Sequence, residues 1–319
     1  MQINEYGRIL VTGGSGFVGR ALVKFLIAHG CRPLVADVDV SETESEGAFQ
    51  IARIDLTDHT AVSDLLEDYG PDLVMHLAGT LGRDDPTGEA CEGLNFAATA
   101  FILDKLSAAG PGKAVLMGSA SEYGDSPTPL REDMEPRPIS HYARSKAMAT
   151  RYATELFNRT GFDVTVLRAF SVYGPDQPAN MFLSQLVRHA LLNLDFNMSD
   201  GTQKRDLLFL DDMVSALVAA SVSQKTAGRV INVGTGRAIA LRDAALYVWN
   251  ACGADPERLH FGAVAKAGDD PFDTLADIAL AGELMNWRPR SSFEAGIRSM
   301  IESTRASLVN EGRTQADPS

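Results

Sequence analysis

Residues 10–20 read Leu-Val-Thr-Gly-Gly-Ser-Gly-Phe-Val-Gly-Arg, and this stretch decides the fold. Its glycines separate an apolar run at 9–11 from an amphipathic run that begins at residue 17. A tight turn from a strand to a helix needs glycine, and a backbone lying against a pyrophosphate leaves no room for a Cβ. The helix start then offers free N–H groups and a positive dipole end to phosphate. The motif predicts dinucleotide binding by Gly13, Ser15, Gly16, Phe17, Val18 and Gly19.

An acidic residue ends the next apolar run, which reads Pro-Leu-Val-Ala-Asp at 33–37. A carboxylate at the end of this second strand can accept both hydroxyls of an adenosine ribose, and it repels a 2′-phosphate. Residues 38–48 contain no Arg or Lys that could hold such a phosphate. We therefore expect Asp37 to favour NAD over NADP. The alternative interpretation is a solvated Asp at a strand end.

Apolar runs alternate with amphipathic helical stretches along the first part of the chain. This alternation predicts a Rossmann-type, doubly wound parallel sheet with helices on both faces and with ligands at the carboxyl ends of its strands. The expected strands are 8–12, 33–37, 51–54, 72–78, 113–118, 163–169 and 229–233. The expected helices include 17–29, 58–68, 91–109, 140–160, 179–192 and 211–223.

The pattern loosens after about residue 170, where loops alternate with short helices. We interpret this part as a smaller, discontinuous C-terminal lobe that holds the substrate against the cofactor. The expected divisions are an NAD-binding domain at 1–170, completed by about 205–235, a substrate lobe at 171–204 and 236–308, and a disordered tail at 309–319.

Composition limits the classes of partner. The 319 residues carry a net charge of −13, which argues against nucleic acid and anionic membranes as partners. The three cysteines are far apart and form neither a disulfide framework nor a metal motif. The N-terminus shows no secretory leader, and no apolar run approaches the length of a membrane span. We expect a cytoplasmic protein without a metal site.

Tyr142 and Lys146 lie four residues apart, so they share one face of the helix expected at 140–160. Ser140 is placed to cap that helix. A phenol is a poor base at neutral pH, but a nearby ammonium or a nicotinamide cation stabilises the phenolate and lowers its pKa. The lysine can also hold the nicotinamide ribose. The pair therefore predicts a proton shuttle for interconversion of an alcohol and a ketone, although such a pair also arises by chance.

Hydroxyl side chains follow the fifth expected strand, in the run Met-Gly-Ser-Ala-Ser-Glu-Tyr-Gly at 117–124. A hydroxyl there can hydrogen-bond the substrate oxygen that Tyr142 protonates or deprotonates. Ser119 is the better candidate and Ser121 the second. The alternative is that both serines only satisfy a turn.

Taken together, these motifs resemble those of the extended short-chain dehydrogenase/reductases, specifically the nucleotide-sugar epimerase/dehydratase group that includes UDP-galactose 4-epimerase. The resemblance covers about residues 8–300. Its marks are the glycine turn, Asp55-Leu56, His76–Gly79, Asn95, Ser119–Gly124, Tyr142 with Lys146, Arg168–Gly174, Gly201–Asp206, Asn232–Gly236, Asp277 and Trp287–Pro289.

The resemblance implies a role for each matching residue. Ser119, Tyr142 and Lys146 form the catalytic set. Arg205 matches a diphosphate-binding arginine, although a surface ion pair with Asp206 is the alternative. The dinucleotide contacts implied are Asp37, Asp55, Leu56, Leu77, Ala78, Gly79, Asn95, Tyr142, Lys146 and the backbone near Phe170. The substrate contacts expected are Thr80, Ser119, Ser121, Ser171, Asn180, Arg205, Lys266 and Asp269.

Several positions depart from the family pattern. Dehydratases have acidic residues where this chain has Ala120 and Ser121, and decarboxylases usually have a Glu at the second position, so both activities are disfavoured. Glu122 follows and, on a strand, would face the opposite way. Ser171 replaces a substrate-contacting Asn, and Lys266 stands where epimerases often have Arg. These two changes leave the contacts to the nucleotide-sugar open.

Three functions remain. The first is an NAD-dependent nucleotide-sugar epimerase, acting at C4 through a 4-keto sugar. The second is an NAD(P)H-dependent NDP-4-keto-6-deoxysugar reductase, which uses the same residues once. The third is a dinucleotide-sensing protein without catalysis, which the retention of Ser119, Tyr142 and Lys146 disfavours. The resemblance also implies a homodimer formed through the helices at 91–109 and 140–160.

Overall fold

Alternate residues of the first strand pack into two different hydrophobic cores. We describe the fold from a computed structural model that covers residues 2–39, 49–82, 85–110, 112–265 and 273–312. Ile9 and Val11 of β1 (Ile9–Thr12) lie in one core, whereas Leu10 lies in the other. Successive side chains of a strand point to opposite faces of a sheet, so a strand that is apolar at every position must be covered on both faces.

Seven strands form the main sheet, and every neighbouring pair in it is parallel. Their order is β10-β6-β5-β4-β1-β2-β3. The direction in which successive strands are added to the sheet therefore reverses between β1 and β4. The carboxyl ends of all seven strands therefore lie along one edge. The strands after β1 are β2 (Leu34–Asp37), β3 (Gln50–Arg53), β4 (Leu73–His76), β5 (Lys113–Ser119), β6 (Asp163–Ala169) and β10 (Val230–Val233).

Helices cover both faces of this sheet, as the alternating pattern predicts. Buried residues of α1 (Phe17–Ala28), α6 (Leu210–Val222) and α8 (Ala279–Met285) form one core with the sheet. Those of α2 (His59–Tyr69), α3 (Thr99–Ala109) and α4 (His141–Thr160) form the other. Each fully buried leucine contributes about 2 kcal/mol through the area it removes from water.

Polar caps set where two of these helices begin. The carboxylate of Asp58 accepts the N–H groups of Thr60 and Ala61 at the start of α2. The predicted cap of α4 is confirmed, because Ser140 Oγ accepts the Ala143 N–H at 3.1 Å. This cap fixes the first turn of α4, which carries Tyr142.

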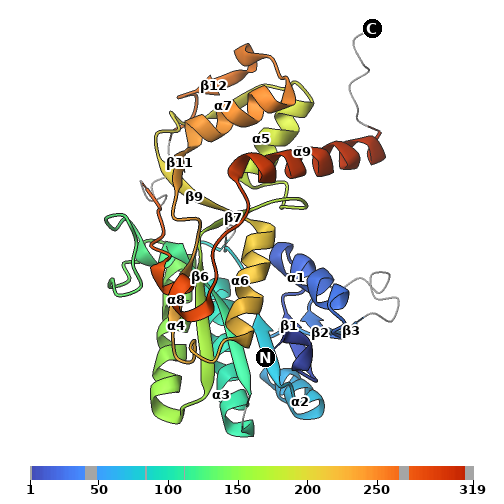
Figure 1. Ribbon diagram of the computed structural model, residues 1–319, viewed down its shortest axis with the longest axis vertical. Coiled ribbons are helices and arrows are strands. Elements are labelled where there is room, and N and C mark those ends of the chain that lie inside the picture. Colours follow the sequence, from blue (N-terminus) through green and yellow to red (C-terminus); the bar gives the residue numbers. More distant parts are fainter. Residues whose placement is uncertain (1, 40–48, 83–84, 111, 266–272, 313–319) are drawn as a thin grey trace.

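The later part of the chain builds a second layer of structure above the main sheet, seen in the upper half of Figure 1. A three-stranded sheet in the order β11-β9-β7 connects it to the main sheet. A third core packs around the buried Trp249. The elements of this second layer are β7 (Ser171–Tyr173), α5 (Phe182–Leu191), β8 (Phe196–Met198), β9 (Lys204–Phe209), β11 (Ala238–Ala240), α7 (Leu241–Cys252), η5 (Pro256–Arg258), β12 (Leu259–Phe261) and α9 (Phe293–Asn310).

The structure confirms the expected fold class, with three differences in detail. The helix expected at 91–109 begins as a π-helix, η3 (Cys91–Ala98), and continues as α3. Within the segment 205–235, expected to complete the NAD-binding domain, β10 joins the main sheet, whereas β9 lies in the smaller sheet. Residues 309 and 310 belong to α9 rather than to a disordered tail. The domain boundaries themselves stay a prediction.

Candidate active site at the carboxyl edge of the sheet

The glycine turn between β1 and α1 is too tightly packed for larger residues. Gly13 has φ +70°, and a Cβ there would lie 2.5 Å from the amide nitrogen of Ala78. A Cβ on Gly19 would overlap the Gly13 carbonyl oxygen. Gly16 forms the N-cap of α1, and no side chain caps its first N–H groups. The turn thus presents backbone donors at a helix N-terminus, which suits a pyrophosphate.

Asp37 lies beside this turn, at the carboxyl end of β2. Its Oδ2 atom accepts the Ser15 hydroxyl at 2.5 Å and the Ser15 N–H at 3.1 Å. From the other side, Arg20 donates to the Ser15 carbonyl oxygen at 2.6 Å. Sequence reasoning missed Arg20, although it ends the decisive motif. These contacts hold Ser15 and the Asp37 carboxylate together where the adenosine ribose is expected.

The segment after β4 is clamped by one amide. Asn95 Oδ1 accepts the Thr80 N–H at 2.8 Å, and its Nδ2 donates to the Thr80 carbonyl at 2.9 Å. The same Nδ2 lies 2.9 Å from the Ser145 hydroxyl. Asn95 is only 1% exposed. Asn95 thus positions the loop that follows Ala78 and Gly79, and its predicted contact with the cofactor stays a prediction.

Ser119, Tyr142 and Lys146 come together where β5 ends and α4 begins. The Ser119 side chain lies near enough to the Tyr142 hydroxyl to lower its pKa, and the Ser119 hydroxyl lies 2.7 Å from the Ser121 hydroxyl. Lys146 Nζ donates to the Met117 carbonyl at 3.0 Å. The neighbouring Gly79 is so near that a Cβ on it would lie 3.2 Å from this Nζ. The three predicted catalytic residues thus share one site.

The protonation of this site differs from expectation in one respect. Burial raises the pKa of Tyr142, and the hydrogen bond from Ser119 only partly opposes this. Lys146, whose ammonium donates to the Met117 carbonyl, does not lower the pKa of Tyr142 as the sequence suggested. Burial also lowers the pKa of Lys146 to about 8.

Glu122 lies beneath the site and was not recognised as part of it. The segment Ala120–Tyr123 is a 3₁₀ turn, η4, rather than a strand, so the predicted alternation does not apply. The Glu122 carboxylate is fully buried, accepts the Ser119 N–H at 2.8 Å and pairs with Arg168 at 2.8 Å. The signals in the sequence were the Ser-x-x-Glu spacing of Ser119 and Glu122, which is typical of a capping box, and the charge of Arg168 inside an apolar strand.

Some predicted cofactor residues direct their side chains into the hydrophobic core. Val18 and Leu77 belong to the core of the α1 face, and Leu56 belongs to the opposite core. The Phe170 ring packs in a separate small cluster, and its N–H donates to the Val233 carbonyl. Contacts of these residues with a dinucleotide are therefore expected from their backbone groups, and they stay a prediction. Asp55 is exposed and accepts two hydrogen bonds from Thr57, which lower its pKa.

The predicted substrate residues are spread over the second layer. Ser171 opens β7, whereas Asn180 is exposed in the loop before α5. Arg205 is 9% exposed on β9 and donates to the Lys204 carbonyl. The neighbouring Asp206 bonds instead to Thr235, Gly236 and Ala276, so the alternative ion pair with Arg205 is wrong. Lys266 and Asp269 lie outside the described residues.

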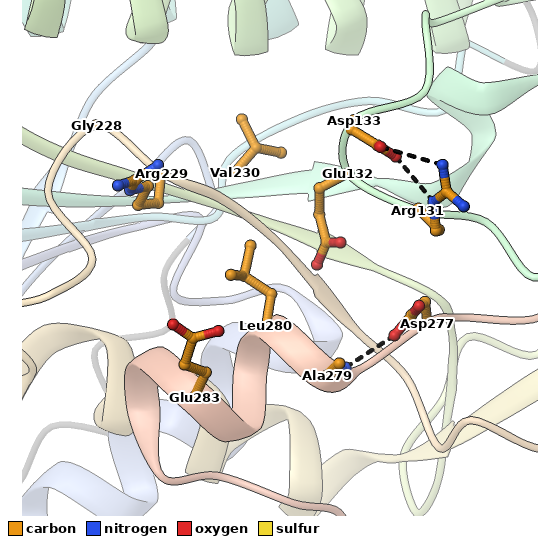
Figure 2. A pocket seen from close by; sticks show the side chains of 10 residues that line it. All are labelled: Arg131, Glu132, Asp133, Gly228, Arg229, Val230, Asp277, Ala279, Leu280 and Glu283. Atoms are coloured by element: carbon orange, nitrogen blue, oxygen red, sulfur yellow. Dashed lines mark hydrogen bonds and ion pairs between the residues drawn. The ribbon is translucent and has the colours of Figure 1, made fainter.

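A cavity of about 490 Å³ lies elsewhere, at the outer edge of the sheet beside β10 and α8 (Figure 2). Charged side chains surround it, and the Arg131–Asp133 ion pair crosses its rim. None of the predicted catalytic residues lines it. We therefore place the candidate active site at the carboxyl edge of the sheet. Within the described residues, no cluster could hold a metal ion and no helix could span a membrane.

Comparison with known proteins shows the family of this chain. Residues 9–234 match the model of the NAD dependent epimerase/dehydratase family. The chain belongs to this family. It is 29% identical to a UDP-glucuronate 4-epimerase of Thermodesulfobacterium geofontis, over 92% of this chain and 95% of that protein. It is 26% identical to a dTDP-6-deoxy-L-talose 4-dehydrogenase (NAD(P)(+)) of Kitasatospora kifunensis, over 92% of this chain and 94% of that one.

A solved structure extends the likeness to three dimensions. MoeE5 in complex with UDP-glucuronic acid and NAD has a TM-score of 0.86 and 30% identity, over 95% of this chain and all of that one. The cofactor of this family is NAD. The residues of this chain fit it, because the first N–H groups of α1 have no side-chain cap and the Asp37 carboxylate lies beside them.

Proposed function

We propose that this protein is a nucleotide-sugar 4-epimerase. The observation that carries the proposal is the joining of Ser119, Tyr142 and Lys146 at the carboxyl end of β5, beside the glycine turn. That arrangement suits removal of a proton from a secondary alcohol next to a nicotinamide. The similarity to a UDP-glucuronate 4-epimerase along nearly the whole chain supports the same reaction class.

Each residue has one part in the reaction. Bound NAD supplies reversible oxidation of the sugar at C4. Tyr142 takes the proton of the 4-hydroxyl and returns it after the 4-keto sugar has presented its other face. Ser119 hydrogen-bonds the same oxygen and Tyr142, so it holds the two in line. Lys146, which shares a face of α4 with Tyr142, holds the nicotinamide ribose and so places the cofactor beside the tyrosine.

The first experiment denatures the purified protein and identifies the released dinucleotide by mass. The native protein is then offered UDP-, GDP-, CDP- and dTDP-sugars while absorbance is followed at 340 nm. Tightly held NAD, with sugar conversion but no net NADH, is the expected result. If the protein instead consumed added NAD(P)H, and did so only when a 4-keto sugar was supplied, the reductase would be the correct function and the epimerase would be wrong.

Tyr142→Phe provides the test of the catalytic residue. We expect kcat to fall by a factor of about 10² to 10⁴ because the proton carrier is lost, while NAD affinity stays nearly unchanged. Ser126→Ala is a suitable control, since that hydroxyl bonds only the Tyr123 carbonyl among the contacts described. Full activity in Tyr142→Phe would show that the assignment is wrong.

The reductase is the second candidate. Similarity to a dTDP-6-deoxy-L-talose 4-dehydrogenase favours it, because that enzyme interconverts an alcohol and a ketone at C4 with net turnover of its cofactor. Dehydration and decarboxylation are disfavoured by Ala120 and Ser121, which supply no carboxyl group at the sugar. A non-catalytic sensor is disfavoured by the intact catalytic set.

The proposal includes a cytoplasmic homodimer. The helices η3, α3 and α4 pack on one another, and Met148 of α4 remains 38% exposed on their surface. A second copy is the expected cover for this surface. Light scattering of the purified chain measures the assembly directly, and a monomeric mass at micromolar concentration would contradict it.

A further inference from the structure

We propose that Glu122 is a positioning residue for the catalytic set, holding the Ser119 backbone and setting the charge around Tyr142 and Lys146. This inference rests on the catalytic roles proposed above. Its starting point is a buried carboxylate directly under the reacting groups. Glu122 is fully buried, and a buried charge needs partners that offset its desolvation.

The contacts of Glu122 connect it directly to Ser119. One oxygen accepts the Ser119 N–H at 2.8 Å, and the other accepts Arg168 Nε at 2.8 Å. Gly118 leaves the room for this, because a Cβ there would lie 2.8 Å from Glu122 Oε1. Ser119 also accepts the Ser121 N–H, which closes the turn. The carboxylate therefore fixes the backbone that positions the Ser119 hydroxyl at the carboxyl end of β5.

The charge of Glu122 also acts on the other two residues. It stabilises the Lys146 ammonium, which raises the pKa of Lys146 against the effect of burial, and it raises the pKa of Tyr142. The other ionisable groups facing the pair are Cys91 from η3 and His76 from β4. Burial holds His76 neutral at physiological pH. Glu122 is thus the anionic carboxylate that acts on both catalytic groups.

Arg168 limits this effect. Its guanidinium pairs with Glu122 and lies 4.5 Å above the Tyr123 ring, whose hydroxyl donates to Asn232. Both members of the ion pair are almost completely buried, so neither charge is screened by water. Removing either one leaves the other uncompensated beneath the site. The two removals should therefore shift the pKa of Tyr142 in opposite directions.

The test measures the titration of Tyr142 itself. Tyrosinate absorbance is followed with pH in the full-length protein and in Tyr142→Phe, and the difference isolates Tyr142. The same two titrations are then repeated with proteins that also carry Glu122→Gln. We expect the pKa of Tyr142 to fall by about half a unit or more when the negative charge is removed. An unchanged pKa would overturn the proposal.

Two further variants make the result specific. Glu132→Gln is the matched control, because Glu132 is a half-buried glutamate that accepts the Asn232 N–H but does not shift Tyr142 or Lys146 (Figure 2). It should leave the titration unchanged, and an equal shift there would overturn the proposal. If Glu122→Gln does not fold, Arg168→Gln replaces it. In that variant the pKa of Tyr142 should rise, and no rise would overturn the proposal.

Activity gives a second readout. A charge effect moves the pH profile of kcat/KM along the pH axis in Glu122→Gln, whereas a purely structural role lowers activity by one factor at every pH. The titration needs no sugar, so it still tests Glu122 if the proposed epimerase activity fails. Conversely, loss of activity in Tyr142→Phe with no titration shift in Glu122→Gln would support the function and overturn this inference.

Discussion

Single carboxylates at this site differ in what surrounds them. One carboxylate oxygen of Asp37 accepts hydrogen bonds from the Ser15 hydroxyl and N–H, and the other accepts the N–H of Val38. Glu122 is fully buried and pairs with an arginine. The first carboxylate is accessible enough to exchange partners with a ribose, whereas the second can act only through its neighbours. Both carboxylates lie at or just after the end of a strand. They differ in burial, and this difference gives them different roles.

Asp37→Ala should weaken the preference for NAD. The variant loses the acceptor for the ribose hydroxyls and the charge that repels a 2′-phosphate, so we expect NAD affinity to fall about tenfold and NADP affinity to fall less. Calorimetric titration with both dinucleotides measures this. Asp39→Ala removes an exposed carboxylate two residues further along and is the matched control. Equal losses for both dinucleotides would contradict the role of Asp37.

At the scale of elements, a buried polar chain connects β1, β4 and the helix that follows η3. His76 Nδ1 lies 2.7 Å from the Thr12 hydroxyl, and its Nε2 lies 2.9 Å from the Thr99 hydroxyl. Thr99 in turn donates to the Asn95 carbonyl, so it accepts from Nε2–H. His76 is therefore a neutral imidazole that donates through Nε2. This series of hydrogen bonds positions Asn95, and hence the loop at Thr80, relative to the glycine turn.

His76 should make the protein sensitive to acid. Burial lowers its pKa from 6.5 to about 3, so below pH 6.5 the unfolded state binds a proton that the folded state excludes. Stability is thus lost as pH falls from 6.5 toward 3. Between pH 7 and 5 this contribution is about 2 kcal/mol.

Urea unfolding at the two pH values measures that loss. In His76→Gln the change in the free energy of unfolding between pH 7 and pH 5 should be smaller than in the wild type by about 2 kcal/mol. The variant should also be less stable than the wild type at pH 7. His59→Gln, an exposed histidine at the start of α2, should retain the wild-type dependence. A wild-type slope in His76→Gln would show that other groups cause the acid sensitivity.

At the scale of the whole molecule, Asp206 joins the two layers. It lies on β9 of the smaller sheet, and it accepts the N–H groups of Thr235 and Gly236, which follow β10 of the main sheet. It also accepts the N–H of Ala276, whose segment pairs with Leu130. One buried carboxylate therefore holds the substrate-side sheet in register with the strand ends that carry the site.

Asp206→Asn should loosen this junction. An amide places N–H donors against backbone N–H groups, so buried donors are left unpaired at a cost of about 2–3 kcal/mol. Urea unfolding measures the loss of stability. Asp200→Asn alters an exposed carboxylate that bonds only Thr202 among the contacts described, and it should be nearly neutral. Equal stability of the two variants would contradict the role of Asp206.

Features that depend on near neighbours in the chain could be predicted from the amino-acid sequence. Alternating apolar runs gave the parallel strands and the helices on both faces, and the glycine turn followed from its spacing. The four-residue separation of Tyr142 and Lys146 placed both on one face of α4. Local periodicity is sufficient here because backbone geometry repeats every two or every 3.6 residues.

The pairing of buried polar groups, in contrast, could not be predicted before the chain was seen folded. Glu122 meets Arg168 across 46 positions of the chain, and Asp206 meets Ala276 across 70. No periodicity reports such pairs, because they depend on which segments cover the strand ends. The same is true of the pKa of Tyr142, which burial raises although a lysine lies one turn away. Desolvation is a property of the whole packed site, so it appears only once the chain has folded.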